Sequence, residues 1–513
     1  MEEQTREHER AIIELKRTRN SLLNISKLPP EVLGNIFRWN TAPTSDFLAW
    51  VDRTHNFLFV CHHWFEVGSR TPELWSFWGT SLKEWKLCCR YPGAAPLDLV
   101  LDGNPHDDHL DRDLHKILQG RATRDTIRRI YLKANAEILL SSIISSLTVN
   151  CEEFQSNSLE SFTLLHDGIV PVDLTNFFAH CRFPKLQHLE FSGYVAPRWD
   201  LLWSRTGALT TLILDSVFPS PMPTTSELLS TLAFNPALQK VSVAISPPRD
   251  GITSSIRVSL RNLKDLGLSG DVRDVVGVLR LLDHPSKLDL SLGLHNCTVG
   301  DISRIVSPYL RDYVGRRGRP QNGLGVYVSE GGNTIGHNVG DVGTLDPSIP
   351  SDRVAWFLSI GIYLDETPPK DLLERAILDL ITYTPQEEIT YFHAFKEPLA
   401  IEVISAHFPN IKALHFGDTS IRPGNLGGDR EIFPSLQSIY LHDVIVGDDD
   451  WSPLTTFLAR HASSGNQLDT LEVFGSPHMC IEVVEDIRNM VRHFRTEPPH
   501  LRRPCPFDTC PDP

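Results

Sequence analysis

The chain has 513 residues, of which 41% are hydrophobic and 22% are charged. This apolar content is enough to bury a large core and excludes wholesale disorder, and the length predicts about three domains unless a repeat array extends one of them. With 49 Lys and Arg against 64 Asp and Glu, the net charge is -15, which argues against nucleic acid or an anionic membrane surface as a partner.

The sequence predicts an intracellular protein, cytoplasmic or nuclear. The first residues lack the apolar stretch of a secretory signal, and no segment reaches the ~18 uninterrupted apolar residues of a membrane span. The longest candidate, residues 138–149, contains four serines and a threonine. The nine cysteines are an odd number and include no C-x-x-C pair, a usage typical of reduced thiols.

Residues 1–26 predict a charged helix, because Ile12, Leu15, Leu22 and Leu23 recur at helical spacing among Glu, Lys and Arg. A break follows at Pro29-Pro30. The prolines fit the first turn of a new helix, where backbone N–H groups have no partner within the helix.

The next helical segments are rich in large apolar residues. The first begins after Pro30 and carries one apolar face, made by Val32, Leu33, Ile36 and Phe37. A second helical pattern runs over residues 57–67, and residues 71–75 begin a third short turn. A module this small cannot cover so many large apolar groups internally, so some should remain exposed for a partner.

Three blocks of this segment together resemble the F-box, the adaptor-binding module of SCF-type ubiquitin ligases. They read Leu28-Pro29-Pro30-Glu31-Val32-Leu33-Gly34-Asn35-Ile36-Phe37, then Val60-Cys61-His62-His63-Trp64, then Thr71-Pro72-Glu73-Leu74-Trp75. The resemblance implies that the partners are the SCF adaptor and, through it, the cullin scaffold. It also implies that the adaptor contacts are Leu28, Pro29, Leu33, Ile36, Phe37, Val60, Cys61 and Trp64.

From about Ile127 the chain repeats the loose pattern L-x-x-L-x-L. The matches start at Ile127, Leu159, Leu186, Leu209, Leu238, Leu263, Ile411, Leu436 and Leu468. Most neighbouring starts lie close to the period of ~20–29 residues that is typical of leucine-rich repeats, which the array resembles. Amphipathic stretches lie between the matches, at 173–181, 226–234, 271–283, 398–408 and 452–461.

Alternating strands and helices at this period must stack on their neighbours to bury their apolar faces. We therefore expect an α/β fold in which a small α-helical F-box precedes an irregular leucine-rich-repeat solenoid with a parallel sheet on its concave face. The expected organisation is a charged helix at 1–26, an F-box domain at 27–80, a connecting segment at 81–126, a repeat array at 127–496 with a flexible Gly-rich insertion at 315–351, and a Pro-rich tail at 497–513.

The repeat array also predicts a surface for a target protein. If the second and third apolar residues of each match face the core, the alternating residues face the concave side. These candidates are His188, Glu190, Thr211, Asp215, Lys240, Asp265, His415, Tyr440, His442 and Glu472. A binding site would use only a central few of them, the others being ordinary solvated strand residues.

Motifs of the common hydrolases, nucleotide-binding proteins and metalloproteases do not occur. His62 and His63 are neighbours that point ~100° apart on a helix and cannot ligate one ion. Cys505 and Cys510 lack a second ligand pair, and the Arg316–Pro320 basic stretch is read as a solvated loop. We therefore predict no catalytic residues, no metal and no cofactor.

The expected function is that of a non-catalytic substrate receptor, which binds the ligase adaptor through the F-box and a target protein through the repeats. Two alternatives stay open. One is a non-ligase protein-interaction scaffold built on the same helical module and array. The other is an enzyme whose site is formed by the 315–351 insertion. The sequence does not identify the target or any modification that its recognition requires.

Overall fold

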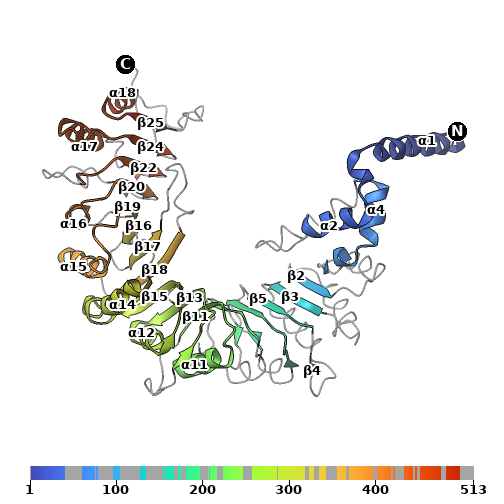
Figure 1. Ribbon diagram of the computed structural model, residues 1–513, viewed down its shortest axis with the longest axis horizontal. Helices are drawn as coiled ribbons and strands as arrows, with labels where there is room; N and C mark the ends of the chain where they lie inside the picture. Colours follow the sequence, from blue (N-terminus) through green and yellow to red (C-terminus); the bar gives the residue numbers. More distant parts are fainter. Residues whose placement is uncertain are drawn as a thin grey trace. The chain divides into compact units, whose positions relative to one another are not determined.

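The computed structural model describes residues 2–40, 60–75, 77–78, 96–103, 127–134, 154–155, 158–166, 172–174, 181–193, 195–196, 206, 208–215, 223–245, 257–285, 287–317, 323–328, 334–341, 355–364, 369–396, 401–417, 420–421, 433–442, 445–446, 451–474 and 481–496. The chain divides into two compact units. Unit 1 is Met1–Pro223 with Ser230–Lys240, and unit 2 is Thr224–Leu229 with Val241–Pro513. Both units combine helices with a mostly parallel sheet, which confirms the predicted α/β class (Figure 1).

Unit 1 starts with a helical head, by which we mean residues 2–40 and 60–75. Its elements are α1 (Glu2–Ser21), η1 (Asn24–Lys27), α2 (Pro30–Asn40), α4 (His62–Ser69) and η3 (Pro72–Trp75). Helix α2 begins at the predicted place, because the Pro29 carbonyl accepts hydrogen bonds from the backbone N–H groups of Val32 and Leu33, both at 3.0 Å. Pro30, which has no N–H group, occupies the first turn at no cost in hydrogen bonds.

The rest of unit 1 is a parallel sheet with buried apolar residues along one face. The strands pair in the order β1 (Phe77–Trp78), β2 (Leu97–Gly103), β3 (Ile127–Ala134), β5 (Ser161–His166), β8 (His188–Gly193) and β10 (Thr211–Asp215). Short parallel pairs join β4 (Phe154–Gln155) to β7 (Cys181–Arg182) and β6 (Val172–Asp173) to β9 (Val195–Ala196). The expected helix at 173–181 therefore has strands at both ends, and residues 175–180 lie outside the described residues.

The strands of unit 2 continue the same alternation. Parallel pairs join β13 (Asp265–Asp271) to β15 (Asp289–Cys297) and β15 to β18 (Ala355–Leu364), with β11 (Lys240–Ala244) beside β13. A second parallel series comprises β19 (Tyr391–Lys396), β20 (Ala413–Gly417), β22 (Ser438–His442), β24 (Thr470–Phe474) and β25 (His493–Thr496). Two-residue pairs link β12 (Val258–Ser259) to β14 (Leu282–Asp283) and β21 (Ser420–Ile421) to β23 (Ile445–Val446).

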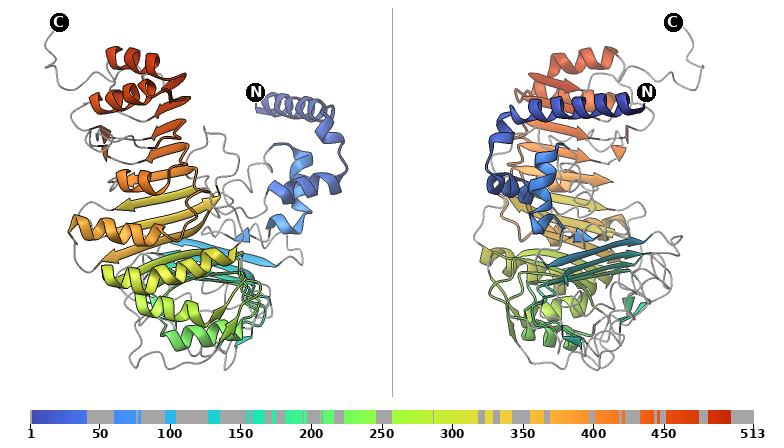
Figure 2. Two further views of the ribbon diagram at one scale, coloured as in Figure 1. Left: turned by 60° about the vertical axis from the view of Figure 1, so that its left-hand side comes forward. Right: turned by 90° about the vertical axis from the view of Figure 1, so that its right-hand side faces the viewer.

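The Gly-rich segment that the sequence predicts as a flexible insertion at 315–351 contains two ordered strands, which differs from the expectation. Strand β16 (Gly323–Val328) pairs with β17 (Thr334–Asp341) in an antiparallel hairpin, β17 pairs with β18, and β16 pairs in parallel with β19. Leu324, Ile335 and Val339 alternate with glycines and polar residues and are fully buried. This two-residue period makes them one apolar face of a strand pair, and Figure 2 shows the yellow strands continuing into the orange and red ones.

The helices of unit 2 lie along one side of its strands (Figure 1). They are α12 (Val272–Leu281), α13 (Val299–Asp301), the π-helical turn η4 (Ile302–Val306), α14 (Ser307–Arg317), α15 (Lys370–Ile381), α16 (Ile401–His407), α17 (Ser452–Ser463) and α18 (Ile481–Met490), while α11 (Thr225–Phe234) precedes β11. The longer helices turn an apolar stripe inward, as Val275, Val276 and Leu279 of α12 do. Within the described parts of the chain, no helix combines the length and apolar character needed to cross a bilayer.

Candidate functional site

The head leaves an unusual share of its apolar side chains exposed. Among the described residues, the exposed large hydrophobic side chains are Ile12, Ile13, Leu15, Leu22, Leu23, Ile25, Val32, Trp39, Val60, Phe65, Phe234, Tyr363 and Leu372. All but the last three belong to the head. Trp39 is the extreme case, with 81% of its surface exposed. Exposed apolar groups concentrated on one small module are typical of a protein interaction site.

The residues that the F-box resemblance assigns to adaptor contact divide into three groups. Leu33 and Phe37 are buried in the core of the head, with Val67 and Leu74, so they do not form the exposed surface that the resemblance implies. Pro29 and Val60 are exposed. The others are half-buried: Leu28, Ile36, Cys61 and Trp64.

The burial of Leu33 and Phe37 follows from the helix geometry. Residues four apart in a helix lie one above the other, so both side chains face α4 and η3. The ring of Phe37 lies 5.2 Å from that of Trp64. Gly34 lets α2 approach closely, because a Cβ at this position would be 3.2 Å from Oγ1 of Thr71. The side of α2 that remains exposed to a partner therefore includes Val32, which directly precedes Leu33 in the sequence.

Polar contacts hold the three helical segments of the head in place. Arg38 of α2 forms an ion pair with Glu73 of η3 at 3.4 Å and donates a hydrogen bond to Asn35 at 2.6 Å. The hydroxyl of Thr71 donates to the Val67 carbonyl at 2.9 Å, which closes the end of α4. These contacts are mostly exposed and individually weak. The apolar core therefore sets the stability of the head.

The predicted target-binding residues of unit 1 lie on the sheet face opposite the core. Leu189 and Phe191 of β8 are buried on the core side, while His188 and Glu190 between them are half-buried on the other side. Thr211, Asp215 and Lys240 take equivalent positions on β10 and at the start of β11. The alternation predicted from the sequence is confirmed for this face.

His188 and Glu190 contact each other at the centre of this face. Nε2 of His188 lies 3.2 Å from Oε2 of Glu190, and the hydroxyl of Thr163 on β5 donates to the same oxygen at 3.4 Å. The pKa of Glu190 is lowered, chiefly by the hydrogen bond from His188, while partial burial opposes the shift and the positive charge of Lys240 adds to it. Glu190 is therefore a fixed negative charge at neutral pH.

The equivalent face of unit 2 is largely covered. His415, Tyr440 and Glu472 align across β20, β22 and β24, and all three are buried. Asp265, on β13, is exposed, while the side chain of His442 lies outside the described residues. The buried members can contact a target only if the groups that cover them move. Unit 1 offers the more accessible set of predicted residues.

Sequence reasoning missed several residues of these faces. In unit 2, His393 on β19 stacks on His415 with the rings 4.2 Å apart, the Tyr391 hydroxyl lies 3.1 Å from Nδ1 of His415, and Arg495 donates to Glu472 at 3.1 Å. The register that aligns His393 with His415 is the signal that could have identified it. The repeat pattern fails at β19 because Ala394 occupies the third apolar position.

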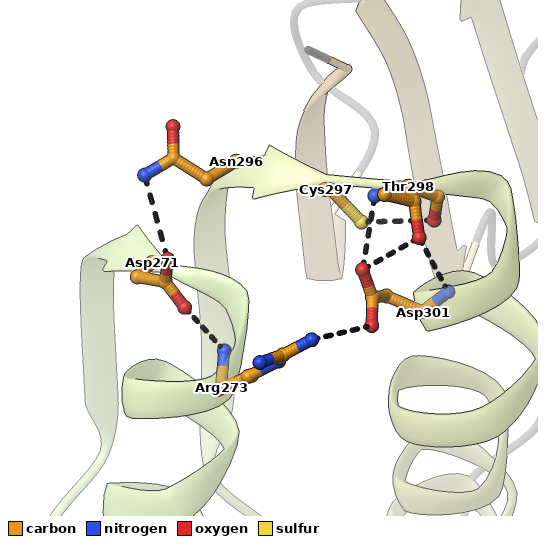
Figure 3. Close-up of polar contacts among 6 residues, drawn as sticks. All are labelled: Asp271, Arg273, Asn296, Cys297, Thr298 and Asp301. Carbon is orange, nitrogen blue, oxygen red and sulfur yellow. Dashed lines mark hydrogen bonds and ion pairs between the residues drawn. The ribbon is translucent and has the colours of Figure 1, made fainter. Parts of the chain in front are cut away.

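A polar network stabilises the ends of β13 and β15, where the chain enters the next helices (Figure 3). It comprises Asp271, Arg273, Asn296, Cys297, Thr298 and Asp301. Asp271 accepts from the backbone N–H of Arg273 at 2.9 Å to cap α12, and Thr298 and Asp301 form a reciprocal capping box on α13. Arg273 lies 3.9 Å from Asp301. The contacts of Asn296 with Asp271 and of Arg273 with Asp301 connect the two capped helix starts, so we assign the network to structure.

Groups able to hold a metal ion do not occur in the described part of the chain, since no three His, Cys, Asp or Glu side chains converge there. His62 is exposed on α4 and His63 is half-buried, as neighbours on a helix should be. Comparison with known proteins gave no match, either to a family model or to a curated protein. The sites above therefore stand on their own geometry.

Proposed function

We propose that the chain is an F-box substrate-recognition subunit of an SCF-type ubiquitin ligase. In this proposal the head binds the adaptor and, through it, the cullin scaffold, while the strands and helices that follow belong to an irregular leucine-rich-repeat solenoid that holds a target protein. The observation that carries the proposal is the concentration of exposed apolar side chains on the head. The F-box resemblance of the same segment supplies the identity of the partner.

Burial of the exposed apolar side chains of the head in an interface would be energetically favourable. Full burial of one valine or larger apolar side chain contributes about 1.5–3 kcal/mol, and Val32, Trp39, Val60 and Phe65 all start exposed. The core of the head contains Leu33, Phe37, Val67 and Leu74 and does not need these four side chains. They are therefore available to a partner without unfolding the module.

The proposed contribution of the protein to ubiquitin transfer is proximity. A receptor that holds adaptor and target together raises the effective concentration of target lysines near the ubiquitin-loaded enzyme. Such a role requires two separate binding surfaces and no reactive centre. The exposed apolar surface of the head and the His188–Glu190 face of the sheet supply two surfaces of different chemistry.

Co-purification with the SCF adaptor tests the proposal. We expect the substitutions Val32→Asp and Val60→Asp together to weaken adaptor binding at least tenfold, because each places a charge where the interface would be apolar. Leu372→Asp is the matched control, since Leu372 of α15 is 41% exposed and Val32 is 42% exposed. The control should bind the adaptor normally.

Two results would count against the proposal. Adaptor binding that survives both substitutions would remove the head from the interface. Recovery of a different partner, with neither adaptor nor cullin in the purified complex, would favour the alternative of a non-ligase interaction scaffold.

A further inference from the structure

One row of side chains, which includes His188, crosses the exposed face of the unit 1 sheet and ends at Lys240, the last residue of unit 1. Register aligns Arg129 of β3 with Ser161 of β5, Ser161 with His188 of β8, and His188 with Thr211 of β10. Lys240 continues the row, because its backbone N–H donates to the Thr210 carbonyl at 3.0 Å just as the N–H of Thr211 donates to the Gln187 carbonyl at 2.9 Å. We call these five residues the donor row.

All five members face away from the core. Each is followed in sequence by a buried apolar residue, namely Ile130, Phe162, Leu189, Leu212 and Val241. Lys240 is exposed and the other four are half-buried. Side chains on one face of adjacent strands point the same way, so the row presents a guanidinium, two hydroxyls, an imidazole and an ammonium in a line.

The charges at the ends of the donor row are not neutralised by ion pairs within the described residues. Arg128, the neighbour of Arg129, forms a bidentate ion pair with the buried Asp98, with nitrogen–oxygen distances of 3.0 and 2.7 Å. The guanidinium of Arg129 makes no such pair in the described structure. Lys240 acts on Glu190 only at longer range. Within the described residues, the row therefore has a positive charge at each end, and the register places the buried Asp98 of β2 beside Arg129.

The negative charge of Glu190 does not neutralise the positive charges at the ends of the donor row. Its carboxylate lies in the next row, where it accepts hydrogen bonds from His188 and Thr163 through one oxygen. This contact between Glu190 and Nε2 of His188 fixes the orientation of the imidazole ring.

We propose that the donor row binds an extended acidic segment of a target protein. Four strand spacings of ~4.8 Å separate Arg129 from Lys240, about 19 Å in all, which an extended segment of about six residues spans at ~3.3 Å per residue. Carboxylates near the ends of the segment would meet Arg129 and Lys240, and polar groups at its centre would meet Ser161, His188 and Thr211. This inference rests on the proposed function and specifies the kind of target that the receptor takes.

Nucleic acid fits the row less well. Binding to a polyphosphate backbone depends on many cations and released counterions, whereas the row has two fixed cations on an acidic chain. A short peptide with a few carboxylates matches both the number and the spacing of the positive groups.

Fluorescence anisotropy with the full-length chain tests the proposal. The probes are labelled eight-residue peptides of one length that are rich in Asp and Glu, in Ser and Gln, or in Lys. We expect only the acidic peptide to bind, with an affinity that falls as salt is added. The double substitution Arg129→Glu and Lys240→Glu should reduce its binding at least tenfold. Arg280→Glu, an exposed cation on α12 of unit 2, is the matched control and should leave binding unchanged.

Several results would overturn the proposal. They are equal binding of the neutral or the basic peptide, loss of binding in the Arg280→Glu control, unchanged binding in the double variant, or preference for a labelled single-stranded DNA over the acidic peptide. Circular dichroism of each variant confirms that the fold is retained. Adaptor co-purification in the same preparations separates the two proposals: it fails if the ligase assignment is wrong and is unaffected if only the acidic-segment inference is wrong.

Discussion

Leu33 and Val32 differ little in chemistry, yet one is fully buried in the head and the other is 42% exposed. The sequence predicts correctly that both lie near one apolar face of α2. It does not predict which of them faces the rest of the head, because that depends on where α4 and η3 pack. Leu33 and Phe37 are four residues apart and both contact that side, which leaves Val32 at the edge. Burial on a small module is decided by these few neighbours.

The Phe37→Ala substitution tests this division between core and surface. It should destabilise the head by about 3–5 kcal/mol, because it removes a fully buried ring that contacts Trp64. Val32→Ala should change stability by less than about 1 kcal/mol. Hydrogen exchange of the α2 and α4 amides measures both. Equal protection in the two variants would contradict the assignment of Phe37 to the core.

Glu190 gives a prediction for pH. Because its pKa is lowered in the folded state, mainly by His188, its interactions stabilise the protein at pH values above the ordinary pKa of a glutamate. This stabilisation is lost as the pH falls through the lowered pKa. The stability difference between the native chain and Glu190→Gln should therefore shrink as the pH is lowered from 6 toward 3, as urea unfolding would show. A constant difference would mean that the carboxylate charge does not contribute.

At the scale of elements, close stacking of strands makes particular glycines indispensable. Gly193 ends β8 with a φ of 88°, and a Cβ there would lie 1.7 Å from the carbonyl oxygen of His166 on β5. Any side chain would both strain the backbone and push the two strands apart. Gly315 on α14 is the opposite case, since a Cβ there meets nothing within 4 Å.

Alanine substitutions at these two glycines should act in opposite directions. Gly193→Ala should destabilise unit 1 by more than about 2 kcal/mol, because it adds the cost of a left-handed alanine to a backbone clash. Gly315→Ala should stabilise its helix by about 0.5–1 kcal/mol, because alanine loses less entropy in a helix. Urea denaturation followed by circular dichroism measures both changes. A neutral Gly193→Ala would show that β5 and β8 are less tightly stacked.

Sequence reasoning predicted the elements with a strong period and missed those without one. The triplets at Leu186, Leu209 and Leu263 are strands with the expected buried faces. Strands β16 and β17 were not predicted, because glycine-rich segments are typical of loops and the sequence does not show which strands they pair with. The capping network of Asp271, Thr298 and Asp301 was also missed, since it depends on two chain segments that meet only in the folded sheet.

At the scale of the whole molecule, the two units differ in how much of the predicted binding surface they expose. Unit 1 carries both the apolar surface of the head and the donor row, and its sheet face is only partly covered. The corresponding residues His415, Tyr440 and Glu472 of unit 2 are buried. The sequence alone does not distinguish these positions in the two units. Alternation predicts the face of the sheet on which a side chain lies, but not whether other residues cover that face. We therefore propose unit 1 as the location of the target surface.

The hairpin of β16 and β17 has a consequence for how this fold can vary. Strand β17 runs against both of its neighbours, so the chain reverses direction twice between β18 and β16, and β19 regains the polarity of β15. The parallel order is restored after β17 because the chain reverses direction an even number of times. Strands that relatives of this chain gain or lose at this point without an intervening helix should therefore come in pairs, since a single such strand would invert every later repeat.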